Sequence, residues 1–185
     1  MTLLRAGLGL FAERGYASTS VREIVDQAGV TKPVLYYYFK SKEGLFCAIL
    51  DSAAAMQGRL LAEVLEVPGT VQERLLGLCR RIYEGVMEHQ SLFRLIHNLL
   101  FGPPQGAPSY DLQVFHKGMA EVIKTIYLEG VARGEVGKED AEEVAGLVLG
   151  LIDFCLHVDF FDLESSDPER PERLLKLAFR GIGGQ

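Results

Sequence analysis

The sequence predicts an all-α protein of about nine helices. Apolar residues recur at helical spacing along nearly the whole chain, and no segment shows the strict alternation of a half-buried strand. Two Ser/Thr-x-x-Glu patterns, starting at Ser20 and Thr70, are typical of capping boxes that begin helices. Clusters of glycine and proline end the helical segments. With 185 residues and 48% apolar content, the chain is long enough to bury a core.

The first two helices follow from spacing and capping. Leu4, Leu8 and Phe11 keep helical spacing in the opening segment, which favours a helix over a signal peptide. The second helix is expected to begin at Ser20, whose hydroxyl accepts from the Glu23 amide while the Glu23 carboxylate reaches back. Its single apolar face consists of Val21, Ile24, Val25 and Ala28.

A tight turn and a third helix follow. Gly29 suits a left-handed turn, Thr31 is placed to cap the next helix, and Pro33 fits its first turn. This order is typical of a helix-turn-helix. One side of the third helix is free to enter a DNA major groove and carries Lys32, Pro33, Tyr36 and Tyr37. The other side carries Leu35, Tyr38 and Phe39.

Three cations occupy positions that the helix dipole disfavours. Arg22, Lys32 and Lys42 each lie in the first turn of successive helices, where a positive charge opposes the macrodipole. Helix N-termini suit anions, so phosphate binding would explain all three. The alternative is that these side chains are simply solvated.

These residues resemble the DNA-binding domain of the TetR family of bacterial transcriptional repressors. The family pattern has a helix ending in Leu-Phe and Gly, a Thr or Ser start, Ile-Ala, Ala-Gly-Val-Ser, Leu-Tyr-x-His-Phe, then Lys and Leu. The matching residues are Leu10, Phe11, Gly15, Thr19, Ser20, Ile24, Ala28, Gly29, Val30, Leu35, Tyr36, Phe39, Lys42 and Leu45. Thr31 replaces Ser, and Val25, Val34 and Tyr38 depart from the usual Ala, Thr and His.

The resemblance implies a DNA-binding domain over residues 1–46 and a helical effector-binding and dimerisation domain over residues 47–185. Six basic and four acidic residues give the first segment a net charge of +2, so the remainder carries −8 and the whole chain −6. A basic head on an acidic body favours oriented approach to DNA. The predicted DNA contacts are Thr19, Arg22, Thr31, Lys32, Pro33, Tyr36, Tyr37 and Lys42.

The rest of the chain is predicted to be helical. A long helix from Ser41 to about Val67 is followed by helices that begin at Thr70 and at a Ser91 cap. The later helices run from about Tyr110 to Arg133 and from Glu139 to Leu163, and the last begins between Ser166 and Pro168.

Small residues in the penultimate helix favour a helix–helix interface. Gly146 and Gly150 stand four residues apart, which exposes a smooth groove, although ordinary packing within the chain is the alternative. In TetR-like proteins the last two helices form the dimer interface, so the resemblance implies a homodimer that uses this groove with Leu174 and Leu177. Paired recognition helices also fit palindromic half-sites.

Candidate effector contacts lie on the helices that enclose the ligand cavity in the resembled family. Asp153 interrupts an apolar run, where a buried carboxylate needs a partner, and His157 lies one turn later. A structural pair, a ligand-facing pair and metal binding are the three alternatives for these two residues. The remaining candidates, which otherwise serve as core, are Phe93, His97, Phe101, Tyr110, Phe115, Met119 and Phe154.

The sequence therefore predicts a cytoplasmic, homodimeric repressor that binds a palindromic double-stranded DNA operator and is released by a small amphipathic or apolar effector. An activator, an architectural DNA-binding protein and a helical enzyme are the alternatives. We expect no enzymatic motif, no cofactor, no metal ion and no membrane segment, since no apolar run approaches a span of about 18 residues. Cys47, Cys79 and Cys155 are expected to be reduced and buried.

Overall fold

A computed structural model of the protein describes residues 2–161, 167 and 169–181. The described residues form nine α-helices and no strand, which confirms the predicted all-α class. The helices are α1 (Thr2–Arg14), α2 (Val21–Ala28), α3 (Lys32–Phe39), α4 (Lys42–Leu65), α5 (Val71–Glu88), α6 (Gln90–Phe101), α7 (Gln113–Ala132), α8 (Ala141–Phe161) and α9 (Arg170–Arg180).

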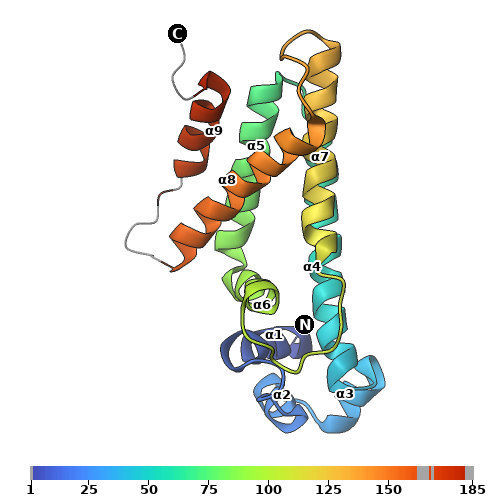
Figure 1. Ribbon diagram of the computed structural model, residues 1–185. Coiled ribbons are helices and arrows are strands. Elements are labelled where there is room, and N and C mark those ends of the chain that lie inside the picture. The colour runs from blue at the N-terminus through green and yellow to red at the C-terminus, as the bar shows by residue number, and fades with distance from the viewer. Residues whose placement is uncertain (1, 162–166, 168, 182–185) are drawn as a thin grey trace. The chain divides into compact units, whose positions relative to one another are not determined.

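The chain divides into two compact units (Figure 1). The head unit is Met1–Met56 with His89–Leu112, and the body unit is Gln57–Glu88 with Gln113–Gln185. The head unit includes α6 because that helix packs against α1. The predicted functional boundary at residue 46 is a different division of the chain, and it stays a prediction.

The head core is a cluster of aromatic and aliphatic side chains. Phe11, Phe46 and Leu95 are at most 1% exposed, and they come from α1, α4 and α6. The ring centroids of Phe46 and Phe11 lie 5.6 Å apart, and those of Phe46 and Tyr16 lie 5.1 Å apart. Edge-to-face pairs of this kind add to the free energy of burial. The short helices α2 and α3 pack onto this core through Ile24 and Leu35.

The body unit is a helical bundle. In it α7 packs against α8, and α5 packs against α7 and α9 (Figure 1). Gly130 of α7 faces Val71 so closely that no Cβ fits between them. Arg74 is only 5% exposed, and its guanidinium pairs with Glu129 and donates to the Leu65 carbonyl at 3.0 Å. A buried charge of this kind needs such partners.

Several predicted helix boundaries are wrong. Ser91 is not a cap, since α6 begins at Gln90 after His89. Helix α7 begins at Gln113 rather than near Tyr110, because the Tyr110 hydroxyl donates to Asp51 at 3.0 Å and holds its segment in the preceding loop. The last helix begins at Arg170; of its predicted start, residues 166 and 168 lie outside the described residues. Cys79 and Cys155 are buried as predicted, whereas Cys47 is half-buried.

Helix α4 is long and apolar enough, by length and composition alone, to cross a membrane, and it is the one such helix in the part of the chain that the structure describes. Asp51 and Arg59 interrupt its apolar residues, so α4 holds no unbroken apolar run of the length that a span needs, and the expectation of no membrane segment stays a prediction. Leu45, Phe46 and Leu50 of this helix are fully buried in the head core. A core helix of a folded domain passes the same test of length and composition.

Candidate functional site

The turn between α2 and α3 has the geometry that the sequence predicted. The Glu23 amide donates to the Ser20 hydroxyl at 3.2 Å, and the Ser20 amide donates to the Glu23 carboxylate at 2.8 Å. These bonds to Ser20 lower the pKa of Glu23. Gly29 has a φ of 66°, in the left-handed region where a side chain would be strained. The capping box and the glycine turn are thus confirmed.

Helix α3 buries little beyond Leu35, which is 0% exposed. The predicted capping bond of Thr31 is wrong, since Thr31 precedes the helix in extended backbone but its side chain makes no capping bond. Its hydroxyl is therefore available to a partner. Tyr36, Tyr37 and Tyr38 are 47%, 73% and 68% exposed. Tyr38, predicted on the side of Leu35, is exposed, whereas Val34 and Phe39 are half-buried and pack with Leu35 on the head core. Lys32 and Pro33 are exposed as well.

Lys40, which the sequence analysis missed, closes the corner after α3. Its φ of 66° is the one left-handed value of a non-glycine residue among the described residues. Its ammonium donates to the Tyr37 carbonyl at 3.1 Å and lies 5.9 Å from the centre of the Tyr37 ring. Gly44 then lies so close to the Phe39 carbonyl that a Cβ would collide with it. The sequence feature that could have indicated this tight corner is Gly44, because a residue without a Cβ is needed for α3 and α4 to approach this closely.

Lys42 faces the interior of the head unit. Its ammonium donates to the Tyr16 and Thr19 carbonyls at 2.9 and 2.8 Å and lies 4.0 Å from the centre of the Tyr16 ring. Burial lowers the pKa of this lysine. The prediction that Lys42 contacts a DNA phosphate did not take these two hydrogen bonds into account. They make Lys42 a brace between α4 and the α1–α2 turn.

Thr19 and Arg22 differ in accessibility. Thr19 is 1% exposed, and its hydroxyl donates to the Gly15 and Leu10 carbonyls at 2.8 and 3.3 Å. Its side chain therefore supports the turn, and no exposed surface of it is available to DNA. Arg22 is exposed, with only a 3.6 Å contact to the exposed Asp26 carboxylate. An ion pair this exposed is weak enough for phosphate to compete with it.

The candidate effector residues of the head unit lie on α6 and in the loop after it. The rings of Phe93, His97 and Phe101 follow one another along α6 in two tilted pairs, with centroid distances of 5.8 and 5.1 Å. Phe101 is 69% exposed. Tyr110 lies in the loop, where burial and then its bond to Asp51 raise its pKa to about 12.

The candidate effector residues of the body unit lie at two places. Phe115 and Met119 are buried in α7, whereas Phe154 and His157 are exposed on α8. The expectation of a buried Asp153 is wrong, since its side chain is 48% exposed and its carboxylate lies 3.4 Å from His116 Nε2. The hydrogen bond to Asp153 raises the pKa of His116.

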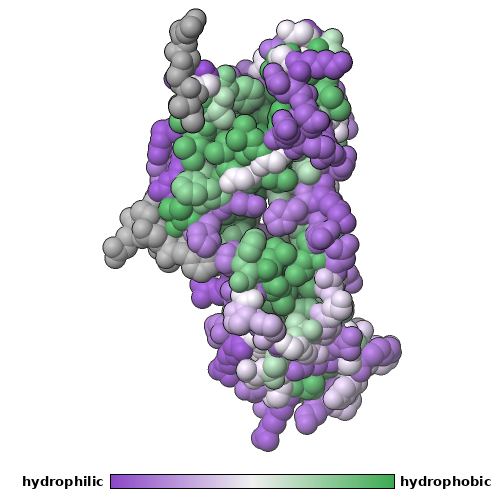
Figure 2. Space-filling view, viewed as in Figure 1, coloured by the Kyte–Doolittle hydropathy of each residue, from purple (hydrophilic) through white to green (hydrophobic). Residues whose placement is uncertain are grey.

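The exposed face of α8 combines two glycines and large apolar side chains with the exposed Asp153 and His157. Gly146 and Gly150 face no described residue within 4 Å of a Cβ position, so they do not serve packing within the described chain. Leu147 and Phe154 flank them, each 55% exposed. Figure 2 shows the hydrophobic surface over α8 and its neighbours. On α9, Leu177 is 49% exposed and Leu174 is half-buried.

Among the described residues, no three or more His, Cys, Asp or Glu side chains are grouped to hold a metal ion. The head unit indicates the class of protein, because its capped helix, glycine turn and exposed second helix form a helix-turn-helix. A helical body unit accompanies it. Together they define a helix-turn-helix transcriptional regulator.

Comparison with known proteins identifies the family. Residues 3–49 match the family described as bacterial regulatory proteins, tetR family. The chain is 31% identical over 134 residues to the HTH-type transcriptional repressor KstR2 of Mycolicibacterium smegmatis, a match that covers 71% of this chain and 64% of that repressor. The chain belongs to the TetR family of transcriptional regulators.

Two further matches extend over most of the chain. The fatty acid metabolism regulator protein of Bacillus subtilis is 25% identical over 160 residues, covering 83% of this chain and 79% of that protein. The crystal structure of the regulator FadR from Bacillus subtilis in complex with stearoyl-CoA matches with a TM-score of 0.79 and 22% identity, over 98% of each chain. At this identity the structural match supports the fold alone.

Proposed function

We propose that the chain is a homodimeric repressor that binds a palindromic operator and releases it when a small molecule binds. The observation that carries this proposal is the bare surface of α3. Tyr37 is 73% exposed, and Lys32 and Thr31 are exposed at the start of the same helix. An amphipathic ring without a covering segment suits contact with bases and sugar at the groove.

The proposed DNA contacts divide into two kinds. Tyr36, Tyr37 and Lys32 are positioned to read base edges, and the exposed cations Arg22 and Lys40 to contact phosphates. Lys42 and Thr19 act indirectly, because they hold the turn that presents α2 and α3. With few phosphate contacts in each copy, affinity gains from a second copy on the same DNA.

The proposed dimer uses the exposed face of α8 together with α9. A face with two glycines and large apolar side chains on either side suits close approach of an identical helix. A two-fold arrangement presents the same patch from both copies, as an isologous interface requires. Leu177 on α9 extends the apolar area.

The proposed effector is an amphipathic acyl thioester or an aromatic compound, and its site lies in the body unit near Phe115 and Met119. The stearoyl-CoA complex of the similar regulator supports the thioester class. In one state of the proposed dimer, the two head units are wrongly spaced for adjacent major grooves. An effector that binds this state more tightly weakens DNA binding by the difference between its affinities for the two states, typically about 1–3 kcal/mol. The proposed regulator acts on DNA in the cytoplasm.

The test is an electrophoretic mobility shift of the full chain on an operator selected from random DNA, with and without stearoyl-CoA. The proposal predicts a retarded complex of two chains that the thioester releases, whereas coenzyme A alone does not. Retention of the complex at saturating thioester would contradict this effector class. Footprinting near a promoter separates the repressor from an activator of the same fold, since an activator protects DNA upstream of the polymerase site.

A further inference from the structure

Helix α3 is poor in the side chains that read bases through paired hydrogen bonds. Arg, Asn, Gln, Asp and Glu, which pair in this way with guanine, adenine or cytosine, are all absent from its sequence. Lys32 and the preceding Thr31 offer polar groups only at the start of the helix. The one amide side chain of α2, that of Gln27, lies against α1, 3.8 Å from the Cβ position of Gly9. The rest of α3 must therefore distinguish bases by another kind of contact.

The outward face of α3 consists of ring side chains. At about 100° per residue, Pro33, Tyr36 and Tyr37 lie on the side opposite the fully buried Leu35. The tyrosine hydroxyls at the ring tips suit phosphates or sugars, whereas the ring carbons suit apolar groups. In the major groove, the apolar group that a base presents is the 5-methyl group of thymine. The outward face of α3 is therefore matched to thymine.

The ring of Tyr37 is held by its neighbours. The Tyr38 ring meets it edge to face, with 5.0 Å between the centroids and 89° between the planes. The Lys40 ammonium donates to the Tyr37 carbonyl at 3.1 Å and lies 5.9 Å from the centre of the Tyr37 ring. A side chain that is already oriented loses less conformational entropy when it binds. Tyr37 therefore presents an ordered apolar surface to a partner.

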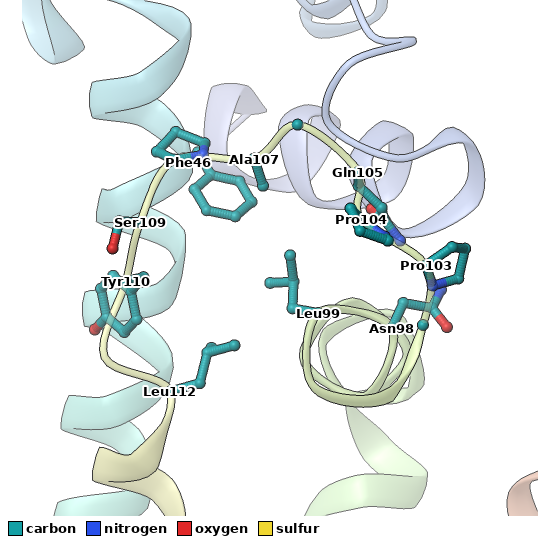
Figure 3. A pocket seen from close by; sticks show the side chains of 13 residues that line it. Phe46, Asn98, Leu99, Pro103, Pro104, Gln105, Ala107, Ser109, Tyr110 and Leu112 are labelled. Atoms are coloured by element: carbon teal, nitrogen blue, oxygen red, sulfur yellow. The ribbon is translucent and has the colours of Figure 1, made fainter.

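The other two tyrosines of the head unit stabilise the fold instead. The Tyr16 ring packs against Phe46, and the Lys42 ammonium lies 4.0 Å from the centre of the Tyr16 ring. Tyr110 lies at the edge of the cavity beneath the α6–α7 loop (Figure 3), and its hydroxyl donates to Asp51 of α4 at 3.0 Å. Both tyrosines are half-buried, whereas the three of α3 are exposed. Tyr110 therefore provides a matched control for a tyrosine that contacts DNA.

We propose that the outward face of α3 reads thymine through its 5-methyl group, with Tyr37 as the principal contact and Tyr36 and Pro33 beside it. This inference rests on the proposed function, since it names the base chemistry that the DNA-binding helix recognises. Each methyl group that the rings cover is removed from water, and burial of one such carbon changes an affinity about fourfold. The operator half-site therefore carries thymine where these rings enter the groove.

The test replaces thymine by uracil, which lacks only the methyl group, in an operator that the full chain selects from random DNA. Mobility-shift titrations should show about fourfold weaker binding for one contacted thymine, about fifteenfold for the symmetric pair, and no change for thymines outside the half-sites. As a second probe, the contacted pair is changed to C·G and to 5-methyl-C·G, and the methylated operator is expected to bind more tightly. Specific binding that is indifferent to both methyl groups would overturn this inference alone, whereas absence of any selected DNA would overturn the proposed function as well.

Variants assign the methyl contact to the ring. Tyr37→Ala is expected to bind the thymine and uracil operators with nearly equal affinity, whereas Tyr37→Phe keeps the ring and should keep the difference. Tyr110→Ala, away from α3, should keep the full difference even where affinity for both operators falls. A difference that persists in full in both Tyr37→Ala and Tyr36→Ala, or that disappears in Tyr37→Phe, would contradict readout by the ring carbons.

Discussion

Helices α3 and α8 both expose large apolar side chains, but their neighbours differ. On α3 the exposed rings belong to three consecutive tyrosines, each with a hydroxyl, and Lys40 follows them. On α8 the exposed large apolar side chains are Leu147 and Phe154, which have no polar atoms; Gly150 lies between them, and the polar Asp153 and His157 are exposed toward the end of the same helix. The exposed fractions of these side chains do not by themselves distinguish the two faces.

The difference indicates two kinds of partner. A partner of α3 must offer hydrogen-bond groups and negative charge, as the grooves and phosphates of DNA do. A partner of α8 must offer apolar area and close backbone approach, which a second copy of α8 provides. The following changes test this contrast, from the largest expected effect to the smallest.

Gly150→Leu is expected to weaken the proposed dimer, because it places a bulky side chain where the proposal brings two copies of α8 together. Overpacking costs about 1–3 kcal/mol in each copy. Sedimentation equilibrium measures the change. Gly58→Leu on α4 is the control, since that glycine also faces open space but lies on a different helix. An unchanged dimer affinity, or a native chain that is a monomer at micromolar concentration, would refute the α8 interface.

Lys42→Met is expected to weaken binding to all DNA sequences alike. The substitution removes two charge-assisted hydrogen bonds from the α1–α2 turn, each worth about 1.5–3 kcal/mol. Because Lys42 faces inward, the slope of log K against log salt should stay unchanged. Arg22→Met should instead reduce that slope by roughly 0.9 for each phosphate that the arginine neutralises. A flatter slope in Lys42→Met would restore its role as a phosphate contact.

Tyr37→Ala is expected to change which bases are preferred. The ring lies on the bare face of α3, and a good base contact is worth about 1–3 kcal/mol of discrimination. Selection from a random DNA library measures the preference. Phe154→Ala, an exposed aromatic residue on α8, should leave the selected sequence unchanged. Identical base preferences in Tyr37→Ala and the native chain would remove Tyr37 from base readout.

The His116–Asp153 pair should make a small, pH-dependent contribution to stability. Since the folded pKa of His116 lies above its usual value of 6.5, the stabilisation is present below that pH and disappears as the pH rises through the folded pKa. For side chains 34% and 48% exposed, about 0.2–1 kcal/mol is expected. Thermal melts across this range should show the change, and Asp153→Asn should abolish it; a persisting dependence in that variant would exclude the pair as its source.

Features set by neighbours in sequence could be predicted. The Ser20 capping box and the Gly29 turn depend on residues within a few positions, and both were correct. The supporting role of Lys42 in the α1–α2 turn could not be predicted, because its bond to the Tyr16 carbonyl joins residues 26 positions apart. The start of α7 depends on Tyr110 reaching Asp51, 59 positions away. Spacing along one helix contains no information on such contacts, or on the cavity beneath the α6–α7 loop.

The central claim is that two copies of α3, joined through α8 and α9, read an inverted repeat. The most direct measurement is selection of random double-stranded DNA by the full chain, followed by the stoichiometry of the complex with the enriched sequence. We predict an inverted repeat whose half-sites lie about one helical turn, or a small multiple of it, apart, bound by an even number of chains. Enrichment of a single asymmetric half-site bound by one chain, or no enrichment at all, would contradict the account.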